Sequence, residues 1–262
     1  MFSLYLECRQ EEKDRLIAEL WERGSIGITE SDLPGGACAL RSFFHDDSQP
    51  SALVREFAAW GARSQPEEQR DWIAEARTKL EPMCVGGRFF LVPEWRSDPT
   101  PPGRFRIEVN PGMAFGTGAH ESTQLCLEAL ERELQPGMTL LDVGAGSGIL
   151  SRAAHLLGAR RVIACDLDPV AIEQARQPLS FVGTADAVRS RSIDLAVANI
   201  SPEAIVSLAP ELVRVLRPGG LIIVSGFELP EITLVHRALD AHGGKVGPSL
   251  TKGSWSAVVA SV

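Results

Sequence analysis

The sequence predicts an α/β protein in which a small α+β domain precedes a larger domain built on a doubly wound, mostly parallel sheet. From residue 106 onward, short apolar segments alternate with segments of helical periodicity, which is typical of a parallel sheet with helices on both faces. Residues 1–62 instead follow the order strand, helix, strand, strand, helix, which is typical of a ferredoxin-like domain.

The first domain is expected to pack its apolar residues between its helices and one face of its sheet. Its expected elements are a strand at 2–8, a helix at 11–24, strands at 24–32 and 36–45 around the turn-forming LPGG, and a helix at 51–62. Its large aromatic residues are expected in the core: Trp21, Phe43, Phe44, Phe57 and Trp60.

Residues 63–105 are expected to connect the two domains. Residues 64–80 have helical periodicity, the strand-like RFFLVP follows at 88–93, and residues 94–104 (EWRSDPTPPGR) contain too many prolines for regular structure. We therefore place the second domain at 106–262.

The second domain is expected to repeat strand and helix in regular order. Strands are expected at 139–143, 161–166, 193–200, 221–226 and 255–262, and helices at 149–158, 168–177, 202–216 and 230–243. The interval from Pro169 to Ile193 is short for a helix, a third strand and a return loop, and Pro178 is expected to end that helix early.

Composition excludes several classes of protein. The formal net charge of −8 gives no electrostatic footprint for extended nucleic-acid binding. The five cysteines show no CxxC spacing, which indicates reduced thiols in a cytosolic protein. The charged start is unlike a signal peptide, and the longest apolar runs have the length of strands rather than of membrane spans. We therefore expect a cytoplasmic protein that binds neither nucleic acid directly nor a membrane.

The segment LLDVGAGSG, at residues 140–148, carries the strongest chemical signal. A strand leads into Gly144, Gly146 and Gly148, and a helix follows directly. Glycines allow the sharp turn and a close approach of a ligand to the backbone, and the free N–H groups of a helix N-terminus attract a negative group. These residues are therefore expected to bind a cofactor.

The cofactor is expected to carry a positive charge as well. A dinucleotide fingerprint needs its third glycine one residue later, where Ile149 stands, and a P-loop needs a Lys-Ser/Thr pair that is absent here. Asp142 is unfavourable beside a pyrophosphate but favourable beside an ammonium group. S-adenosylmethionine has an ammonium, a sulfonium and a carboxylate, and it fits both observations.

Asp166 adds to this prediction because it ends the second strand, 20 residues after Gly146. An acid at this point accepts hydrogen bonds from ribose hydroxyls. With the LxPGG segment at 216–220, these features predict a Rossmann-like, S-adenosylmethionine-dependent methyltransferase domain with a seven-stranded sheet. An NAD-dependent oxidoreductase is disfavoured by Asp142 and by the early third glycine.

Four segments together resemble the ribosomal protein L-eleven methyltransferase family: NPGMAFGTGAHEST at 110–123, LLDVGAGSGIL at 140–150, ACDLDPVAI at 164–172 and VANI at 197–200. Residues 71–95 are also similar to that family's linker, so the resemblance covers about residues 70–230. The family's DPG and THxTT patterns are replaced here by NPG and AHEST.

The resemblance implies an enzyme that transfers methyl groups to lysine side chains and the N-terminal amine of ribosomal protein L-eleven. It implies an N-terminal domain that recognises the protein substrate, a catalytic contact by Asn199, and no metal in the site. The residues that it implies beside the cofactor are Phe115, Gly116, Thr117, Gly118 and Asn199. We expect a monomer.

Other functions stay open at this point. The chain could methylate another protein or a small amine, or it could be a degenerate protein that binds S-adenosylmethionine without catalysis. His120 fits either a catalytic role or a structural one at the start of a helix.

Overall fold

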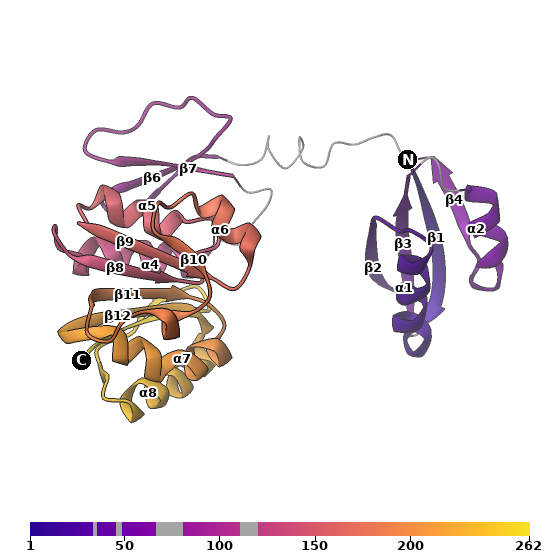
Figure 1. Ribbon diagram of the computed structural model, residues 1–262. Coiled ribbons are helices and arrows are strands. Elements are labelled where there is room, and N and C mark those ends of the chain that lie inside the picture. The colour runs from indigo at the N-terminus through magenta and orange to yellow at the C-terminus, as the bar shows by residue number, and fades with distance from the viewer. Residues whose placement is uncertain (34–35, 46–48, 67–80, 111–119) are drawn as a thin grey trace. The chain divides into compact units, whose positions relative to one another are not determined.

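The protein divides into two compact units, Met1–Ala76 and Arg77–Val262. The computed structural model describes residues 1–33, 36–45, 49–66, 81–110 and 120–262 (Figure 1). Within these described ranges, no helix is both long enough and apolar enough to cross a membrane.

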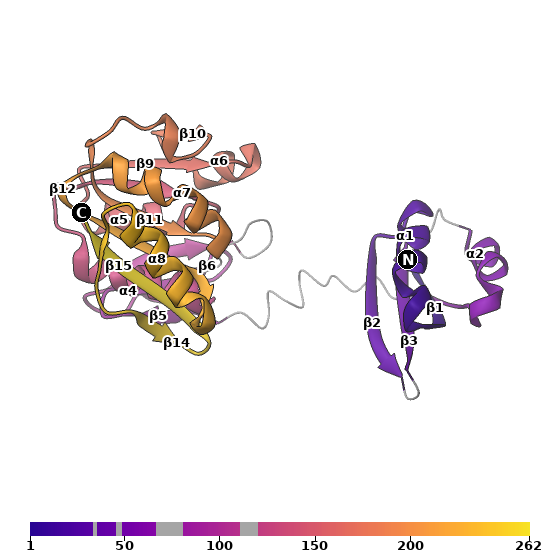
Figure 2. The ribbon, with the colours of Figure 1, turned by 90° about the horizontal axis from the view of Figure 1, so that it is seen from below.

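The N-terminal unit is a four-stranded antiparallel sheet in the order β2-β3-β1-β4. Its elements are β1 (Phe2–Arg9), α1 (Lys13–Glu22), β2 (Gly27–Leu33), β3 (Ala37–Phe44), α2 (Pro50–Glu56) and β4 (Arg63–Pro66). Figure 2 shows β3 next to β2 in this unit. The arrangement is ferredoxin-like, as the sequence predicts, with β4 added to the expected order of strand, helix, strand, strand, helix.

The core of this unit contains Phe44 and Phe57, which are buried, but not Trp21. The expectation that Trp21 is a core residue is wrong, because 51% of its surface is exposed. Leu20 is fully buried, and successive residues of a helix point about 100° apart, so the residue after Leu20 turns away from the sheet.

The strand β4 lies where the sequence pattern suggests the start of a connecting helix. Residues 63–66 pair antiparallel with β1, with Phe2 opposite Pro66. All four side chains of β4 are exposed, so the strand has no apolar alternation from which it could be recognised. The rest of the expected helix, residues 67–80, lies outside the described residues.

A small sheet, β5-β6-β7, begins the second unit. It consists of β5 (Met83–Val85), β6 (Phe89–Pro93) and β7 (Phe105–Val109). Buried side chains of these strands join the core formed with α4 (Glu121–Glu133) and α5 (Ile149–Leu156). This part of the expected connecting segment therefore packs as part of the larger unit.

The main sheet confirms the predicted doubly wound, mostly parallel architecture, but among the described residues it has eight strands and not the predicted seven, because the short β14 also pairs with β15. Its order is β10-β9-β8-β11-β12-β15-β13, with β14 paired to β15, and the first five strands of this row run parallel. The strands are β8 (Thr139–Val143), β9 (Arg161–Asp166), β10 (Ser180–Val182), β11 (Ile193–Asn199), β12 (Leu216–Glu228), β13 (Lys245–Val246), β14 (Leu250–Lys252) and β15 (Trp255–Ser261).

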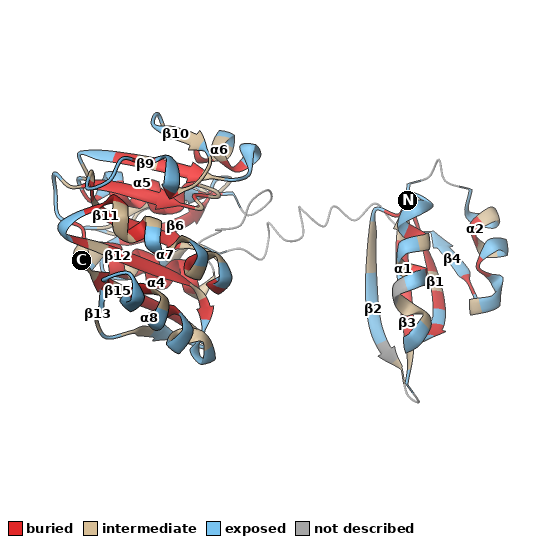
Figure 3. Ribbon diagram, turned by 60° about the horizontal axis from the view of Figure 1, so that its bottom comes forward, coloured by how far each residue is buried: buried red, intermediate tan, exposed pale blue. Residues whose placement is uncertain are grey.

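Helices cover both faces of this sheet, whose central strands are largely buried (Figure 3). Side chains of α4 and α5 share one core with one face, whereas α7 (Pro202–Val215) and α8 (Ile232–Ala241) share a second core with the other. The helix α6 (Pro169–Ala175) ends before Pro178, as the sequence predicts, and β10 has only three residues.

Candidate functional site

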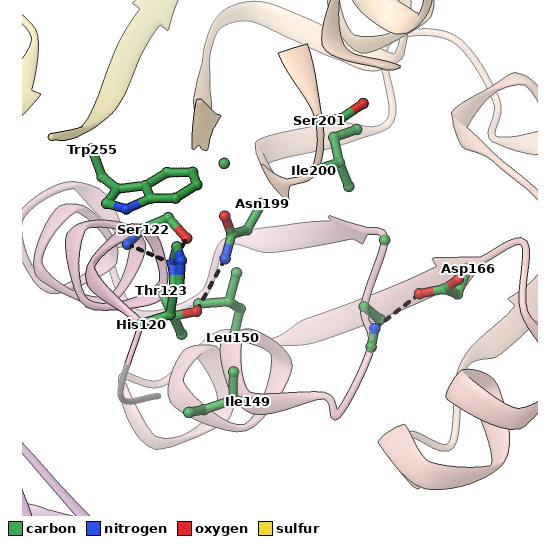
Figure 4. A pocket seen from close by; sticks show the side chains of 14 residues that line it. His120, Ser122, Thr123, Ile149, Leu150, Asp166, Asn199, Ile200, Ser201 and Trp255 are labelled. Atoms are coloured by element: carbon green, nitrogen blue, oxygen red, sulfur yellow. Dashed lines mark hydrogen bonds between the residues drawn. The ribbon is translucent and has the colours of Figure 1, made fainter. Parts of the chain in front are cut away.

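A cavity of about 390 Å³ lies at the carboxyl ends of β8, β9 and β11 (Figure 4). Its position beyond the strand ends is where open parallel sheets bind ligands, and its volume suits a small molecule. It is lined by His120, Ser122, Thr123, Gly144, Ala145, Gly146, Ile149, Leu150, Asp166, Asn199, Ile200, Ser201, Gly226 and Trp255.

The glycine turn forms the floor of this cavity. Gly144, Gly146 and Gly148 have φ values of 72°, 51° and 72°, a region that favours glycine. A Cβ atom on Gly144 would lie 2.4 Å from Ile200 Cγ2, and one on Gly148 would lie 2.8 Å from the backbone of Ala175. The turn therefore needs glycine both for its conformation and for close packing.

Asp166 joins β9 to the glycine turn. Its Oδ2 accepts a hydrogen bond from the Gly146 N–H at 2.9 Å (Figure 4). Its Oδ1 accepts one from the Asp168 N–H at 3.0 Å. A carboxylate has about four lone-pair sites, so both oxygens keep capacity for a further donor. Asp166 lies in the cavity wall, as its expected contact with a ribose requires.

Asp142 lies behind the turn and does not line the cavity. Its side chain is fully buried, and its Oδ2 accepts a hydrogen bond from Ser151 Oγ at 2.6 Å. Its Oδ1 is buried and has no hydrogen-bond partner among the described residues. Burial raises the pKa of Asp142 to about 6, because removal from water disfavours the charged form, although the Ser151 hydrogen bond opposes this shift.

Asn199 is the last residue of β11, and its amide points into the cavity wall (Figure 4). Its Nδ2 donates a hydrogen bond to Thr123 Oγ1 at 3.1 Å. Its Oδ1 is buried and lacks a partner within the described part of the chain. The site therefore holds one amide oxygen that is ready to accept a hydrogen bond.

His120 caps the helix α4 at the rim of the cavity. Its Nδ1 accepts a hydrogen bond from the Ser122 N–H at 3.3 Å and lies 2.8 Å from Ser122 Oγ. Its ring meets the ring of Trp255 edge-on, with centroids 4.3 Å apart. These contacts give His120 a structural role at the start of the helix.

Other predicted site residues are not covered by the structure. Phe115, Gly116, Thr117 and Gly118 lie outside the described residues. Across the described ranges, no group of three or more His, Cys, Asp or Glu side chains could hold a metal ion.

Comparison with known proteins gives one consistent answer. The family model described as ribosomal protein L11 methyltransferase (PrmA) matches residues 38–262. The chain belongs to the ribosomal protein L11 methyltransferase family.

Individual members of this family show the extent of the similarity. The ribosomal protein L11 methyltransferase of Bacillus cereus (strain Q1) is 38% identical over 203 residues, which cover 73% of this chain and 65% of that relative. The enzyme of the same description from Pelobacter propionicus is 38% identical over 207 residues, covering 73% and 67%. The chain therefore spans slightly less than two thirds of the length of the Bacillus relative.

A solved structure agrees with this membership. The ribosomal protein L11 methylase from Lactobacillus delbrueckii subsp. bulgaricus aligns with a TM-score of 0.64 and 29% identity, covering 69% of this chain and 98% of the other.

Thr123 and Trp255 are among the cavity residues of this L11 methyltransferase family member that sequence reasoning does not find. Thr123, on α4, holds the Asn199 amide, and Trp255 begins β15 on another part of the rim. Thr123 ends the NPGMAFGTGAHEST segment, which is a signal that could have drawn attention to it. Trp255 has no such motif, since only the fold brings the start of β15 to the cavity.

Proposed function

We propose that this chain is an S-adenosylmethionine-dependent N-methyltransferase that methylates lysine side chains and the N-terminal amine of ribosomal protein L11. The observation that carries the proposal is the unpartnered, buried Asn199 Oδ1 in the wall of a cavity beside the glycine turn. Membership of the L11 methyltransferase family supports both the reaction and the substrate.

The residues around the glycine turn fit the proposed cofactor. Asp142 does not line the cavity, but its buried Oδ1 has no partner among the described residues, and an ammonium group bound on the cavity side of the glycine turn would stabilise its charged form without direct contact. The Asp166 carboxylate is suited to ribose hydroxyls. Bound there, S-adenosylmethionine supplies an electrophilic methyl group on its sulfonium. Further proposed contacts are Gly144, Gly146, Gly148, Phe115, Gly116, Thr117, Gly118 and Asn199.

The acceptor amine must be neutral when it attacks, whereas a free lysine has a pKa of about 10.4. Asn199 Oδ1 accepts one N–H of the neutral amine and thereby orients its lone pair. The apolar side chains of Trp255 and Ile200 line the same cavity, and an apolar surrounding disfavours the charged ammonium form. The proton therefore leaves to solvent as the amine enters, and positioning supplies much of the rate.

The N-terminal unit is the proposed recognition domain for the ribosomal protein, and the catalytic domain follows the connecting segment. We propose that the protein acts in the cytoplasm as a monomer, without direct contact to nucleic acid or to a membrane. The family membership supports a ribosomal protein as the substrate.

The test is a transfer assay with total ribosomal protein and tritiated S-adenosylmethionine. We expect label in L11. Label confined to other proteins or to small amines would overturn the substrate. Calorimetric binding of S-adenosylmethionine without label in any fraction would indicate a degenerate binding protein, and binding of NAD alone would overturn the cofactor.

A further inference from the structure

A second cavity, of about 380 Å³, lies on the other side of the glycine turn and shares no lining residue with the first. Its lining includes residues from β7, from α5, which contacts β7, and from the end of α6. It is lined by Glu94, Glu108, Asn110, Ser147, Arg152, Gln174 and Arg176.

Arg152 is held in this cavity at an energetic cost. Its Nε is buried and forms no hydrogen bond within the described part of the chain. Leaving a buried polar group without a partner is unfavourable, and more so when the group is charged. Burial lowers the pKa of Arg152, and the neighbouring charge of Arg176 lowers it further, while Glu108 opposes both effects.

Arg176 adds a second unfavourable feature. It follows the last residue of α6 and has a φ of 50°, one of two positive values found at described residues other than glycine. Left-handed backbone at such a residue costs about 1–2 kcal/mol. Arg176 thereby places its guanidinium at the same cavity as the Arg152 guanidinium, although the two positive charges repel each other.

The acidic residues of the cavity already have partners of their own. Glu108 pairs with Arg106 at 3.2 Å, and Glu94 accepts a hydrogen bond from Asn110 Nδ2 at 2.6 Å. By contrast, neither Arg152 nor Arg176 forms an ion pair with any described carboxylate. The two guanidinium groups therefore remain available to a ligand.

We propose that this cavity binds an anionic carboxylate or phosphate group between Arg152 and Arg176. Guanidinium groups present paired N–H donors that match the oxygens of such groups, and an anion there would offset the repulsion between the two arginines. Within the described fold, the unpartnered Nε and the backbone strain have no compensating contact, and Glu108 offsets less of the repulsion than Arg176 causes. One bound anion accounts for both the repulsion and the unpartnered Nε.

The cavity adjoins the cofactor site, since Ser147 lines the one and Gly146 the other. If the proposed function holds, the carboxylate belongs either to the methyl donor or to an acidic side chain of the protein substrate. The two sources share the same chemistry, so they are separated by experiment.

The first experiment needs no enzymatic activity. Thermal unfolding of the full chain is followed in sodium phosphate and in sodium acetate, each against sodium chloride at equal ionic strength. We expect at least one of the two anions to raise the melting temperature, because a ligand that binds only the folded state stabilises it.

Two variants and one control sharpen this experiment. Arg152→Met keeps the apolar stem, and Arg176→Asn places a residue that tolerates positive φ; each should weaken anion binding about 10-fold or more, as expected for a lost hydrogen bond to a charged group. Arg161→Gln removes an exposed charge at the start of β9 and should leave binding unchanged.

Without added anion, Arg152→Met should melt no lower than the wild type, because it removes the unpartnered Nε. A lower melting temperature would mean that the guanidinium stabilises the fold itself and would overturn the proposal. The proposal would also be overturned if neither anion raised the melting temperature of the wild type, or if the variants responded to the anions as strongly as the wild type does.

A second experiment distinguishes the sources. Calorimetry compares S-adenosylhomocysteine with methylthioadenosine, which lacks the amino-acid carboxylate. If Arg152→Met weakens the binding of S-adenosylhomocysteine but not the binding of methylthioadenosine, the carboxylate belongs to the methyl donor. A raised KM for the protein substrate with unchanged cofactor affinity assigns it to the substrate. If Arg152→Met changes neither the affinity for S-adenosylhomocysteine nor the KM for the protein substrate, the cavity binds neither of these carboxylates. A wild type that binds anion but not S-adenosylhomocysteine would contradict the proposed function and not the anion site.

Discussion

The orientation of one amide is the most informative feature at the residue scale. Thr123 Oγ1 accepts the Nδ2 hydrogen bond of Asn199, so the carbonyl oxygen is the end that remains for a ligand. Enzymes use such preorganised polar groups where they meet a reacting atom. The orientation therefore supports the role proposed for Asn199.

Substitution of Asn199 should therefore affect turnover more than cofactor affinity. We expect Asn199→Ala to lower kcat about 10-fold or more, the loss expected for one hydrogen bond in the transition state, with a smaller change in the Kd for S-adenosylhomocysteine. Asp166→Ala should show the opposite order, since its carboxylate lies in the wall of the cavity proposed for the cofactor. Steady-state kinetics and calorimetry on both variants measure this, and a reversed order would contradict the assigned roles.

Asp142 should make stability depend on pH in a direction opposite to most carboxylates. Its folded pKa is raised to about 6, above its ordinary value, so folding favours the protonated form. The resulting stabilisation is fully present below the unfolded pKa, near 4, and is lost as pH rises through about 6. The loss amounts to about 3 kcal/mol at most for a shift of about two units.

The matched variant for this effect is Asp142→Asn, which cannot ionise. Urea unfolding of both proteins without cofactor, at pH 4.5 and pH 7.5, should show the wild type losing more unfolding free energy over this interval than the variant. Identical pH dependence in the two proteins would show that Asp142 does not titrate as described.

Part of the site can be predicted from sequence for a physical reason. Gly144, Gly146, Asp166 and Asn199 follow or end parallel strands, and the ends of such strands meet at one edge. Trp255 cannot be found in this way, because its approach to the cavity depends on how β15 is placed beside β12.

At the scale of elements, the glycine turn is fixed by its contact with α6. We expect Gly148→Ala to lower the unfolding free energy by about 2–4 kcal/mol, from backbone strain and a clash with Ala175. Gly219→Ala is the control, because Gly219 has a φ of 79° but a Cβ added there would have no atom within 4 Å. Urea unfolding measures the loss of unfolding free energy in each variant. Equal losses in the two variants would show that the contact with α6 contributes nothing to stability.

The helix α1 offers a second comparison, between two neighbouring residues. Leu20 is fully buried, whereas Trp21 is half exposed. Leu20→Ala should destabilise the N-terminal unit by about 2–5 kcal/mol, as for other buried leucines, and Trp21→Ala by less than about 1 kcal/mol. Unfolding monitored by circular dichroism tests this, and a larger loss for Trp21→Ala would contradict the assigned burial.

The elements themselves could be predicted where periodicity is strong and not where it is absent. The strands and helices after residue 139 combine apolar runs with clear turns, and they occur close to their expected positions. The strand β4 could not be predicted, since its four residues are exposed and polar or proline. Only its pairing with β1 makes it a strand.

At the scale of the whole molecule, the chain joins a ferredoxin-like unit to a methyltransferase-type unit. The overall charge of −8 is compatible with a basic protein substrate. The larger unit supplies both cavities, so the recognition of a protein substrate and the transfer of a methyl group are proposed for different parts of the chain.

The most direct test of the account uses purified ribosomal protein L11 with S-adenosylmethionine that carries a deuterated methyl group. Peptide mass spectrometry then locates the label. We expect labelled lysine ε-amines and a labelled N-terminal amine with the wild type, and little label with Asn199→Ala. Unlabelled L11, under conditions in which calorimetry shows that S-adenosylmethionine is bound, would contradict the account.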